Sequence, residues 1–165
     1  MYEIIASGYD ELHRQEQMNK LRIIRENLAL QGSERILDVG CGPCWSRIFF
    51  NNVIGIDPVP YNEHILCASA ESIPFADETF DLILCVTAAH HFEIDRALTE
   101  MMRVTTKETL LVITVLKKAR SYSNICQHLQ TSLRVLSTID EGHDIIFFLD
   151  KNSTLVNHLL VSTIQ

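Results

Sequence analysis

The hydrophobic positions of the chain follow a helical period near its start. Within a charged stretch at residues 16–30, Leu21, Ile24 and Leu28 recur three and four positions apart, and Gly32 follows where a helix end is expected. The pattern predicts an amphipathic helix that packs one apolar face against the rest of the protein.

Short apolar runs then predict five β-strands, at residues 35–39, 52–56, 64–67, 80–86 and 109–116. The third run is the weakest of the five, whereas the last two are apolar throughout, as in strands that are covered on both faces. Residues 44–51 are all that separates the first two strands, which leaves room for a two-turn helix. This spacing favours a compressed crossover between parallel strands.

The second half of the chain continues the alternation. Residues 94–102 carry an apolar helical face, and residues 121–131 predict a further helix. Residues 133–139 and 144–149 are two more strands, joined by a short polar link with the composition of a turn. The order predicts a three-layer α/β sandwich with a mostly parallel sheet and a terminal antiparallel hairpin. In such sheets, ligands bind at the carboxyl ends of the strands.

Length and charge narrow the class of protein. The 165 residues, 47% of them hydrophobic, fit one domain at residues 1–152, with residues 1–32 as a helical cover. Residues 153–165 form a tail that is either a terminal helix or foreign to the domain. The net charge of −7 argues against unaided binding to nucleic acid or to an anionic membrane. Without a leader pattern or an apolar run of roughly 18 residues, the sequence predicts a soluble, cytoplasmic protein.

The five cysteines are odd in number and scattered, which indicates free thiols in a reducing compartment rather than a disulfide framework. Cys41 and Cys44 enclose Gly42 and Pro43 directly after a predicted strand, which is the spacing of thioredoxin active sites. A thiol–disulfide oxidoreductase is therefore one alternative function. A single pair of this kind, with no second pair and no spaced histidines, does not predict a metal site.

A tight glycine turn follows the first predicted strand and leads into a helix. Glycine lets the backbone approach a ligand closely because no Cβ stands in the way. A dinucleotide fingerprint would need a glycine where Trp45 stands and an acid further along the chain than Asp57. The ligand is therefore expected to lack a pyrophosphate. Asp57, at the tip of the second strand, is placed to accept hydrogen bonds from both hydroxyls of a ribose, which implies an adenosine group.

Five ordered segments resemble a known family, namely ILDVGCGPC, GIDP, ASAESIPFADETFDLILC, AAHHF and ALTEMMRV. Their order and spacing are similar to those of class I S-adenosylmethionine-dependent methyltransferases, in particular the methyltransferase type 11-like group with small quinone-type and archaeal enzymes. The resemblance spans about residues 9–150. It implies a seven-stranded sheet with a reversed last strand. It also implies methyl transfer from S-adenosylmethionine, with S-adenosylhomocysteine as product, to an acceptor that is a small molecule or a macromolecule.

The resemblance also implies contacts with each part of the cofactor. The methionine part would lie against Asp38, Gly40 and Gly42, and the ribose against Asp57. The adenine edge would be lined by Ser69, Ala70 and Glu71. The sulfonium would lie beside Cys85, Val86 and Thr87. Tyr9 is expected to fold over the cofactor, and Gln17 to line the same edge.

Two departures from the family pattern concern cofactor binding. Cys44 stands where the third glycine of the loop is usual, and Ser69 stands where an acid usually holds the adenine amino group. Weaker recognition of adenine is therefore expected.

His90 and His91 follow the fourth predicted strand, where an acceptor would meet the methyl group, so they are the candidate general bases.

No insertion in the sequence is long enough to cover the substrate. The pocket is therefore expected to be completed by a large substrate, a second copy of the chain or an activating partner subunit. A partner could add a strand at residues 64–67, although the N-terminal helix could itself cover the pocket. A subunit that binds the cofactor without catalysing transfer is the second alternative function.

Overall fold

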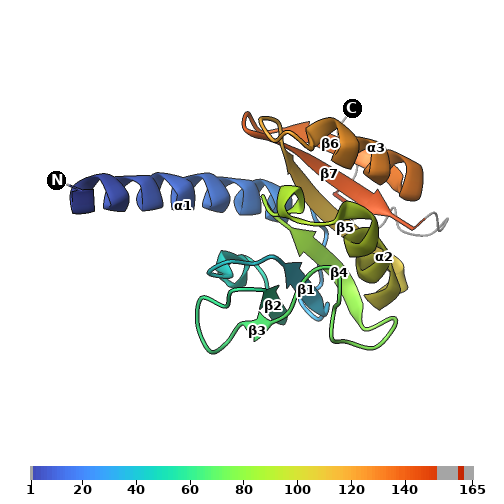
Figure 1. The fold of residues 1–165 in the computed structure, drawn as a ribbon. Helices are drawn as coiled ribbons and strands as arrows, with labels where there is room; N and C mark the ends of the chain where they lie inside the picture. Colours follow the sequence, from blue (N-terminus) through green and yellow to red (C-terminus); the bar gives the residue numbers. More distant parts are fainter. Residues whose placement is uncertain (1, 152–159, 162–165) are drawn as a thin grey trace.

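A seven-stranded sheet forms the centre of the molecule (Figure 1). The computed structural model describes residues 2–151 and 160–161, with residues 2–10 described as backbone only. The strands are β1 (Ile36–Val39), β2 (Val53–Asp57), β3 (Leu66–Cys67), β4 (Phe80–Cys85), β5 (Thr105–Leu116), β6 (Arg134–Asp140) and β7 (Asp144–Asp150). The helices are α1 (Tyr2–Glu26), α2 (Ile94–Val104) and α3 (Tyr122–Ser132), with two 3₁₀ turns, η1 (Trp45–Ile48) and η2 (Ala89–His91).

The strand order across the sheet is β3-β2-β1-β4-β5-β7-β6. The first five of these strands pair in parallel, and β7 runs antiparallel to both of its neighbours. This arrangement confirms the mostly parallel sheet, the reversed last strand and the terminal hairpin that the sequence predicts. It also brings the carboxyl ends of β1, β2 and β4 to one edge, because parallel neighbours end on the same side.

Both faces of the sheet are covered, as the apolar runs predict. Successive residues of a strand point to opposite faces, so Leu111 belongs to the core under α2 and α3, and Val112 to the core under α1. Leu98 of α2 lies in the first core, and Ile24 of α1 lies in the second. Figure 1 shows α1 on one side of the sheet and the other two helices on the opposite side. The three-layer sandwich is confirmed.

The crossover between β1 and β2 differs from the sequence prediction. A two-turn helix is expected over residues 44–51, but the structure has the short 3₁₀ turn η1. Cys44 precedes this turn in the left-handed conformation, with φ 58°, and Asn52 ends the segment with φ 53°. These two positions confine the helical stretch to four residues. Residues 58–65 and 68–79, all of which are described, likewise contain no α-helix.

The two ends of the chain differ from expectation in separate ways. Helix α1 begins at Tyr2, well before the predicted start, and ends at Glu26. Most of the predicted tail, residues 153–165, lies outside the described residues. Of its two described positions, Leu160 forms an antiparallel bridge with Leu28, and the Val161 N–H donates to the Asn27 carbonyl at 3.2 Å. The division into a domain and a tail remains a prediction.

Candidate functional site

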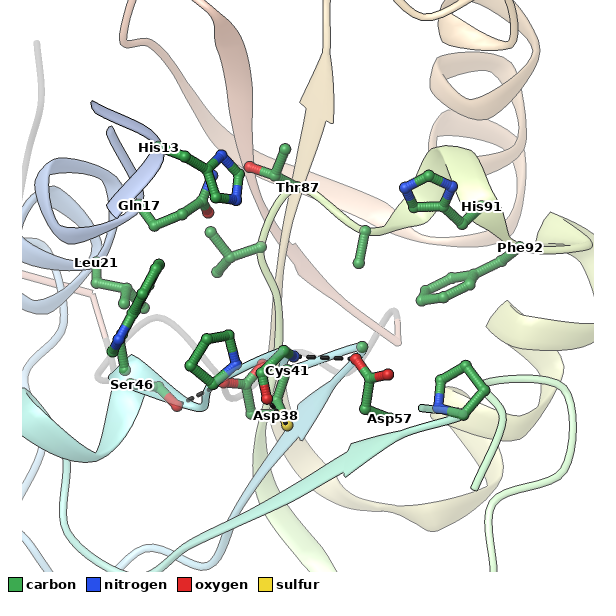
Figure 2. A pocket seen from close by; sticks show the side chains of 17 residues that line it. His13, Gln17, Leu21, Asp38, Cys41, Ser46, Asp57, Thr87, His91 and Phe92 are labelled. Carbon is green, nitrogen blue, oxygen red and sulfur yellow. Dashed lines mark hydrogen bonds between the residues drawn. The ribbon is translucent and has the colours of Figure 1, made fainter. Parts of the chain in front are cut away.

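A cavity of about 290 Å³ lies where the parallel strands end. Its walls come from α1, from the segments that follow β1, β2 and β4, and from η2. Figure 2 shows Gln17 and His13 of α1 on one side of the space, and Asp57 with Phe92 on the other. The position matches the ligand site expected for a sheet of this topology.

The turn after β1 brings backbone directly to the cavity. Gly40 and Gly42 have φ values of 68° and 51°, which glycine adopts without strain. A Cβ on Gly40 would lie 2.7 Å from Ala88 Cβ and 2.9 Å from Phe92 Cζ, so only glycine fits there. The N–H groups of Gly40 and Cys41 both donate to the Ile56 carbonyl, at 2.9 and 3.0 Å, which ties the turn to the end of β2.

Asp57 lines the cavity from the end of β2. Its Oδ2 accepts a hydrogen bond from the Gly42 N–H at 3.0 Å, and its Oδ1 accepts one from the Val59 N–H at 2.9 Å (Figure 2). These bonds fix the orientation of the carboxylate. Each oxygen has a second lone pair, so both can still accept a hydrogen bond from a ligand hydroxyl.

Asp38 lines the cavity from the end of β1 and is 4% exposed. Burial raises the pKa of its carboxyl to about 7, and the hydroxyl of Ser46, which donates to Oδ2, opposes that rise. A buried carboxylate is disfavoured unless a positive charge or further donors accompany it. A cationic ligand group in this part of the cavity would therefore be stabilised by Asp38 in its ionised form.

Thr87 marks the end of β4 and is held in a strained conformation. Its φ is 53°, which is unusual for a β-branched residue. Its N–H donates to Thr114 Oγ1 at 2.7 Å, and its hydroxyl donates to Asp144 Oδ2 at 2.9 Å. The same hydroxyl accepts a hydrogen bond from Lys20 Nζ at 2.9 Å, and Lys20 also pairs with Asp144 Oδ1 at 3.0 Å. Lys20 and Asp144 are both fully buried, so α1 is joined to the floor of the cavity.

Gln17 contributes a buried hydrogen-bond donor to the cavity. The residue is 7% exposed, and its Nε2 has no hydrogen-bond partner. Figure 2 shows its side chain reaching from α1 toward the space. Because an unpaired buried amide is unfavourable, this donor indicates where an acceptor atom of a ligand belongs.

The two histidines after β4 occupy different positions. His91 lines the cavity and is exposed, whereas His90 is half-buried and is not part of the lining. Their ring centroids are 4.0 Å apart. Burial, followed by the proximity of His91, lowers the pKa of His90, so its imidazole is held neutral. Of the pair, His91 is the one that a bound acceptor could reach.

The structure brings several of the predicted site residues together and leaves others outside the cavity. Asp38, Gly40, Gly42, Asp57, Val86 and Thr87 line it, as do Gln17 and His91. Ser69, Ala70, Glu71 and Cys85 do not, and the side chain of Tyr9 lies outside the described residues. The Glu71 carboxylate instead accepts the Glu93 N–H at 2.7 Å. The cofactor roles of these residues remain predictions.

Sequence reasoning missed other residues of the lining, among them His13, Leu21, Trp45, Ser46, Pro58, Ala88 and Phe92. Leu21 was identified only as an apolar helix position. Pro58, Ala88 and Phe92 lie in the segments GIDP and AAHHF but were given no role, and the remaining residues carry no pattern that separates them from surface or core residues. Within the part of the chain that the structure describes, no cluster of three or more metal-ligating side chains occurs, and no helix is long and apolar enough to cross a membrane.

Comparison with known proteins identifies methyltransferases that are similar to this chain. Residues 37–113 match the family described as "Methyltransferase domain". This match and the fold support a class I S-adenosylmethionine-dependent methyltransferase. An uncharacterized methyltransferase of Bacillus subtilis, YcgJ, is 28% identical over 118 residues, which cover 57% of this chain and 47% of YcgJ. The chain spans about half the length of the curated relatives that it matches.

Solved structures share the fold of this chain at low identity. One is the 1,6-didemethyltoxoflavin-N1-methyltransferase of Burkholderia thailandensis, with bound S-adenosylhomocysteine. It has a TM-score of 0.67 and 13% identity, and the match covers 92% of this chain and 87% of that one. Another is a putative methyltransferase of Haloferax volcanii in complex with the Trm112 activator. It has a TM-score of 0.69 and 11% identity, with coverage of 88% and 95%.

The residues of the cavity fit S-adenosylmethionine. Gly42 has no atom within 4 Å of the position that its Cβ would take, and Gln17 offers an unpaired donor. Asp57 can accept from two hydroxyls, and Asp38 needs a positive charge beside it. Cys44, which replaces the usual third glycine, has the left-handed backbone conformation that glycine adopts readily. The departure in sequence therefore leaves the path of the turn intact.

Proposed function

We propose that this chain binds S-adenosylmethionine in the cavity and transfers its methyl group to an acceptor. The observation that carries the proposal is the meeting, in one cavity, of the glycine turn, the Asp57 carboxylate and the unpaired amide of Gln17. Asp57 would accept hydrogen bonds from the ribose hydroxyls. Asp38 would face the ammonium group of the methionine part, and Gln17 Nε2 would donate to its carboxylate.

The bound cofactor supplies a methyl group on a positively charged sulfur that is a good leaving group. The task of the protein is then to orient the acceptor, hold it in line with the methyl group and exclude water. Val86 and Thr87 line the cavity where β4 ends, so they would set the position of the reacting groups. The network of Lys20, Thr87 and Asp144 keeps this position fixed, because the Thr87 backbone and hydroxyl are both restrained.

His91 is the proposed proton acceptor where the acceptor group must lose a proton. It lines the cavity, and its exposure allows the proton to pass on to solvent. His90, in contact with the His91 ring, would orient it rather than touch the substrate. An acceptor that is already anionic, or a neutral amine, needs neither histidine.

Calorimetric titration of the reduced protein with S-adenosylmethionine and S-adenosylhomocysteine tests the proposal. Micromolar binding is expected for both ligands. Asp57→Ala should weaken it by about tenfold or more, since a hydrogen bond to a charged group contributes about 1.5–3 kcal/mol. Asp95→Ala, which removes a carboxylate on the exposed face of α2, is the matched control and should bind as the wild type does. Absence of binding by the reduced wild type would refute the proposal.

A partner subunit or a second copy of the chain is proposed to complete the acceptor side of the pocket. His91 lines the cavity and is exposed, so the proposed acceptor side is open to solvent. The Haloferax volcanii protein is solved as a complex with its Trm112 activator, which is a precedent within this fold. Sedimentation and activity measurements on the isolated chain test the idea. A monomer that methylates a small molecule at ordinary rates would contradict it.

A further inference from the structure

Two thiols lie together on the turn that carries Gly42. Their sulfurs pack against the same point of β2: a Cβ built on Gly55 would lie 2.7 Å from Cys41 Sγ and 2.8 Å from Cys44 Sγ. The Cys44 N–H donates to the Cys41 carbonyl at 2.8 Å, which closes a tight turn between the two residues. The Cα atoms of such a turn are within about 7 Å, close to the range that a disulfide spans. Both cysteines are free in this structure.

The two sulfurs differ in access and in acidity. Cys41 is half-buried and lines the cavity, whereas Cys44 is 3% exposed. A hydrogen bond between the two thiols raises the pKa of Cys41 and lowers that of Cys44 to about 6. The Ser46 hydroxyl, 3.5 Å from Cys44 Sγ, acts in the same direction on Cys44. Cys44 is thus the buried and more acidic thiol of the pair, and Cys41 is the thiol that meets the solvent.

We propose that Cys41 and Cys44 form a redox site at which a small disulfide oxidises the pair, and that the resulting disulfide weakens cofactor binding. The second half of this statement rests on the proposed function. The methyltransferase activity does not need two cysteines here, since the cofactor would contact the turn through its backbone. Core packing does not account for both cysteines either, because the Cys41 side chain is partly exposed at the cavity.

The chemistry is a thiol–disulfide exchange with an external disulfide of the glutathione type. Cys41 loses its proton to solvent, and its sulfur bonds to one sulfur of the external disulfide, which releases one thiolate. The Cys44 thiolate then attacks Cys41 Sγ, forms the Cys41–Cys44 bond and expels the second thiolate. The pair loses two electrons and the external disulfide gains them, ending as two thiols.

The effect on the cofactor passes through Gly42, which lies between the two cysteines. Its N–H holds Asp57 Oδ2 at 3.0 Å, and this bond fixes the carboxylate proposed to bind the ribose. Joining the two sulfurs covalently draws Cys41 and Cys44 together and moves the amide between them. Loss of that one bond weakens cofactor binding by about tenfold, the factor that corresponds to 1.4 kcal/mol.

The test equilibrates the full-length protein with defined ratios of reduced and oxidised glutathione, followed by acid quenching and peptide mass mapping. A Cys41–Cys44 disulfide is expected, with the loss of two hydrogens from the peptide that contains both. The affinity for S-adenosylhomocysteine is then measured by calorimetry on the reduced and the oxidised protein. The oxidised protein should bind about tenfold more weakly, and dithiothreitol should restore the original affinity.

Three variants separate the pair from the remaining thiols. Cys41→Ser should bind S-adenosylhomocysteine with an affinity that glutathione disulfide does not change, whereas Cys44→Ser should stop at the mixed disulfide between Cys41 and glutathione, which the mass map detects. A control with Cys67→Ser and Cys126→Ser keeps the pair and should respond as the wild type does. Only the ratio of oxidised to reduced affinity within each protein is compared, so an effect of a substitution on basal binding does not matter.

Each outcome decides a separate part of the proposal. Failure to form the Cys41–Cys44 disulfide at any glutathione ratio would overturn it, as would equal affinities of the reduced and oxidised proteins. A reduced protein that does not bind S-adenosylhomocysteine would refute the proposed function and, with it, the effect on the cofactor. The mass map would still establish or exclude the redox pair, because it requires no bound ligand.

Discussion

Replacement of Lys20 by methionine is the sharpest test of how the cavity is held together. Lys20 is 1% exposed, and its ammonium group contacts Asp144 Oδ1 at 3.0 Å, Thr87 Oγ1 at 2.9 Å and Glu141 Oε1 at 3.9 Å. Methionine keeps the length and apolar stem of the side chain but removes the charge. The Asp144 carboxylate then stays buried with two hydroxyl donors and no cation, and the carboxylate of Glu141 lies nearby.

Removing one partner of a buried ion pair lowers the free energy of unfolding by about 3–5 kcal/mol, because the other charge stays desolvated. We expect Lys20→Met to fall in that range. Lys117→Met is the matched control, since Lys117 pairs with Asp140 at 2.6 Å on the surface, where pairs contribute about 0–1 kcal/mol. The Lys117–Asp140 contact is at least as short as the Lys20–Asp144 contact, so the comparison measures the effect of burying the ion pair.

The assay is urea unfolding followed by the fluorescence of Trp45, the one tryptophan of the chain. A double variant with Lys20→Met and Asp144→Asn should recover more than about 1 kcal/mol of the loss, because it no longer leaves a charge unpaired. Binding of S-adenosylhomocysteine by Lys20→Met should also weaken, as the restraint on Thr87 is lost. A loss of stability no greater than that of Lys117→Met would refute this account of the network.

Three further predictions concern the walls of the cavity. Gly40→Ala should lower the free energy of unfolding by about 2 kcal/mol or more in urea unfolding, because its Cβ would overlap Ala88. Gly142→Ala is the control: Gly142 has a positive φ as well but no such overlap, so its free energy of unfolding should fall by less. Gln17→Leu should leave stability unchanged or raised but weaken cofactor binding about tenfold in calorimetry, since it removes an unpaired donor. The affinity for S-adenosylmethionine should fall up to about tenfold per pH unit below pH 7, because the cation binds ionised Asp38, whose pKa in the free protein is about 7; Asp38→Asn should flatten this profile.

The sheet could be predicted because its strands are short apolar runs bounded by turn residues. Residues 80–86 and 109–116 are apolar on both faces, so both strands were recognised. β4 follows its prediction closely, whereas β5 begins earlier than predicted, at Thr105. The helix between these strands was equally plain from its apolar face. The turn η1 was not, because the left-handed backbone at Cys44 depends on contacts of the folded turn with Gly55, and no local propensity specifies it.

The cofactor side of the site was partly predictable for a similar reason. A glycine turn after a strand and an acid at the next strand end are local signals, and they locate Gly40, Gly42 and Asp57. Lys20 gave no such signal and Gln17 was expected only through the family resemblance, since a polar residue in a charged helix normally faces solvent. Only their spacing with Leu21, Ile24 and Leu28 places them on the buried face. Lys20 is also more than 60 residues away in sequence from its hydrogen-bond partner Thr87.

The position of Lys20 and Gln17 makes α1 a working part of the site rather than a separate cover. The helix is held to the sheet by Leu21 and Ile24 and by the buried ammonium of Lys20, and it presents Gln17 to the cavity. Any opening of α1 would remove one wall of the cavity and release Thr87 at the same time. A ligand that needs both walls binds only the docked form, so by mass action it stabilises the docking of α1. Cofactor binding and the packing of the N-terminal helix are therefore one coupled equilibrium in this fold.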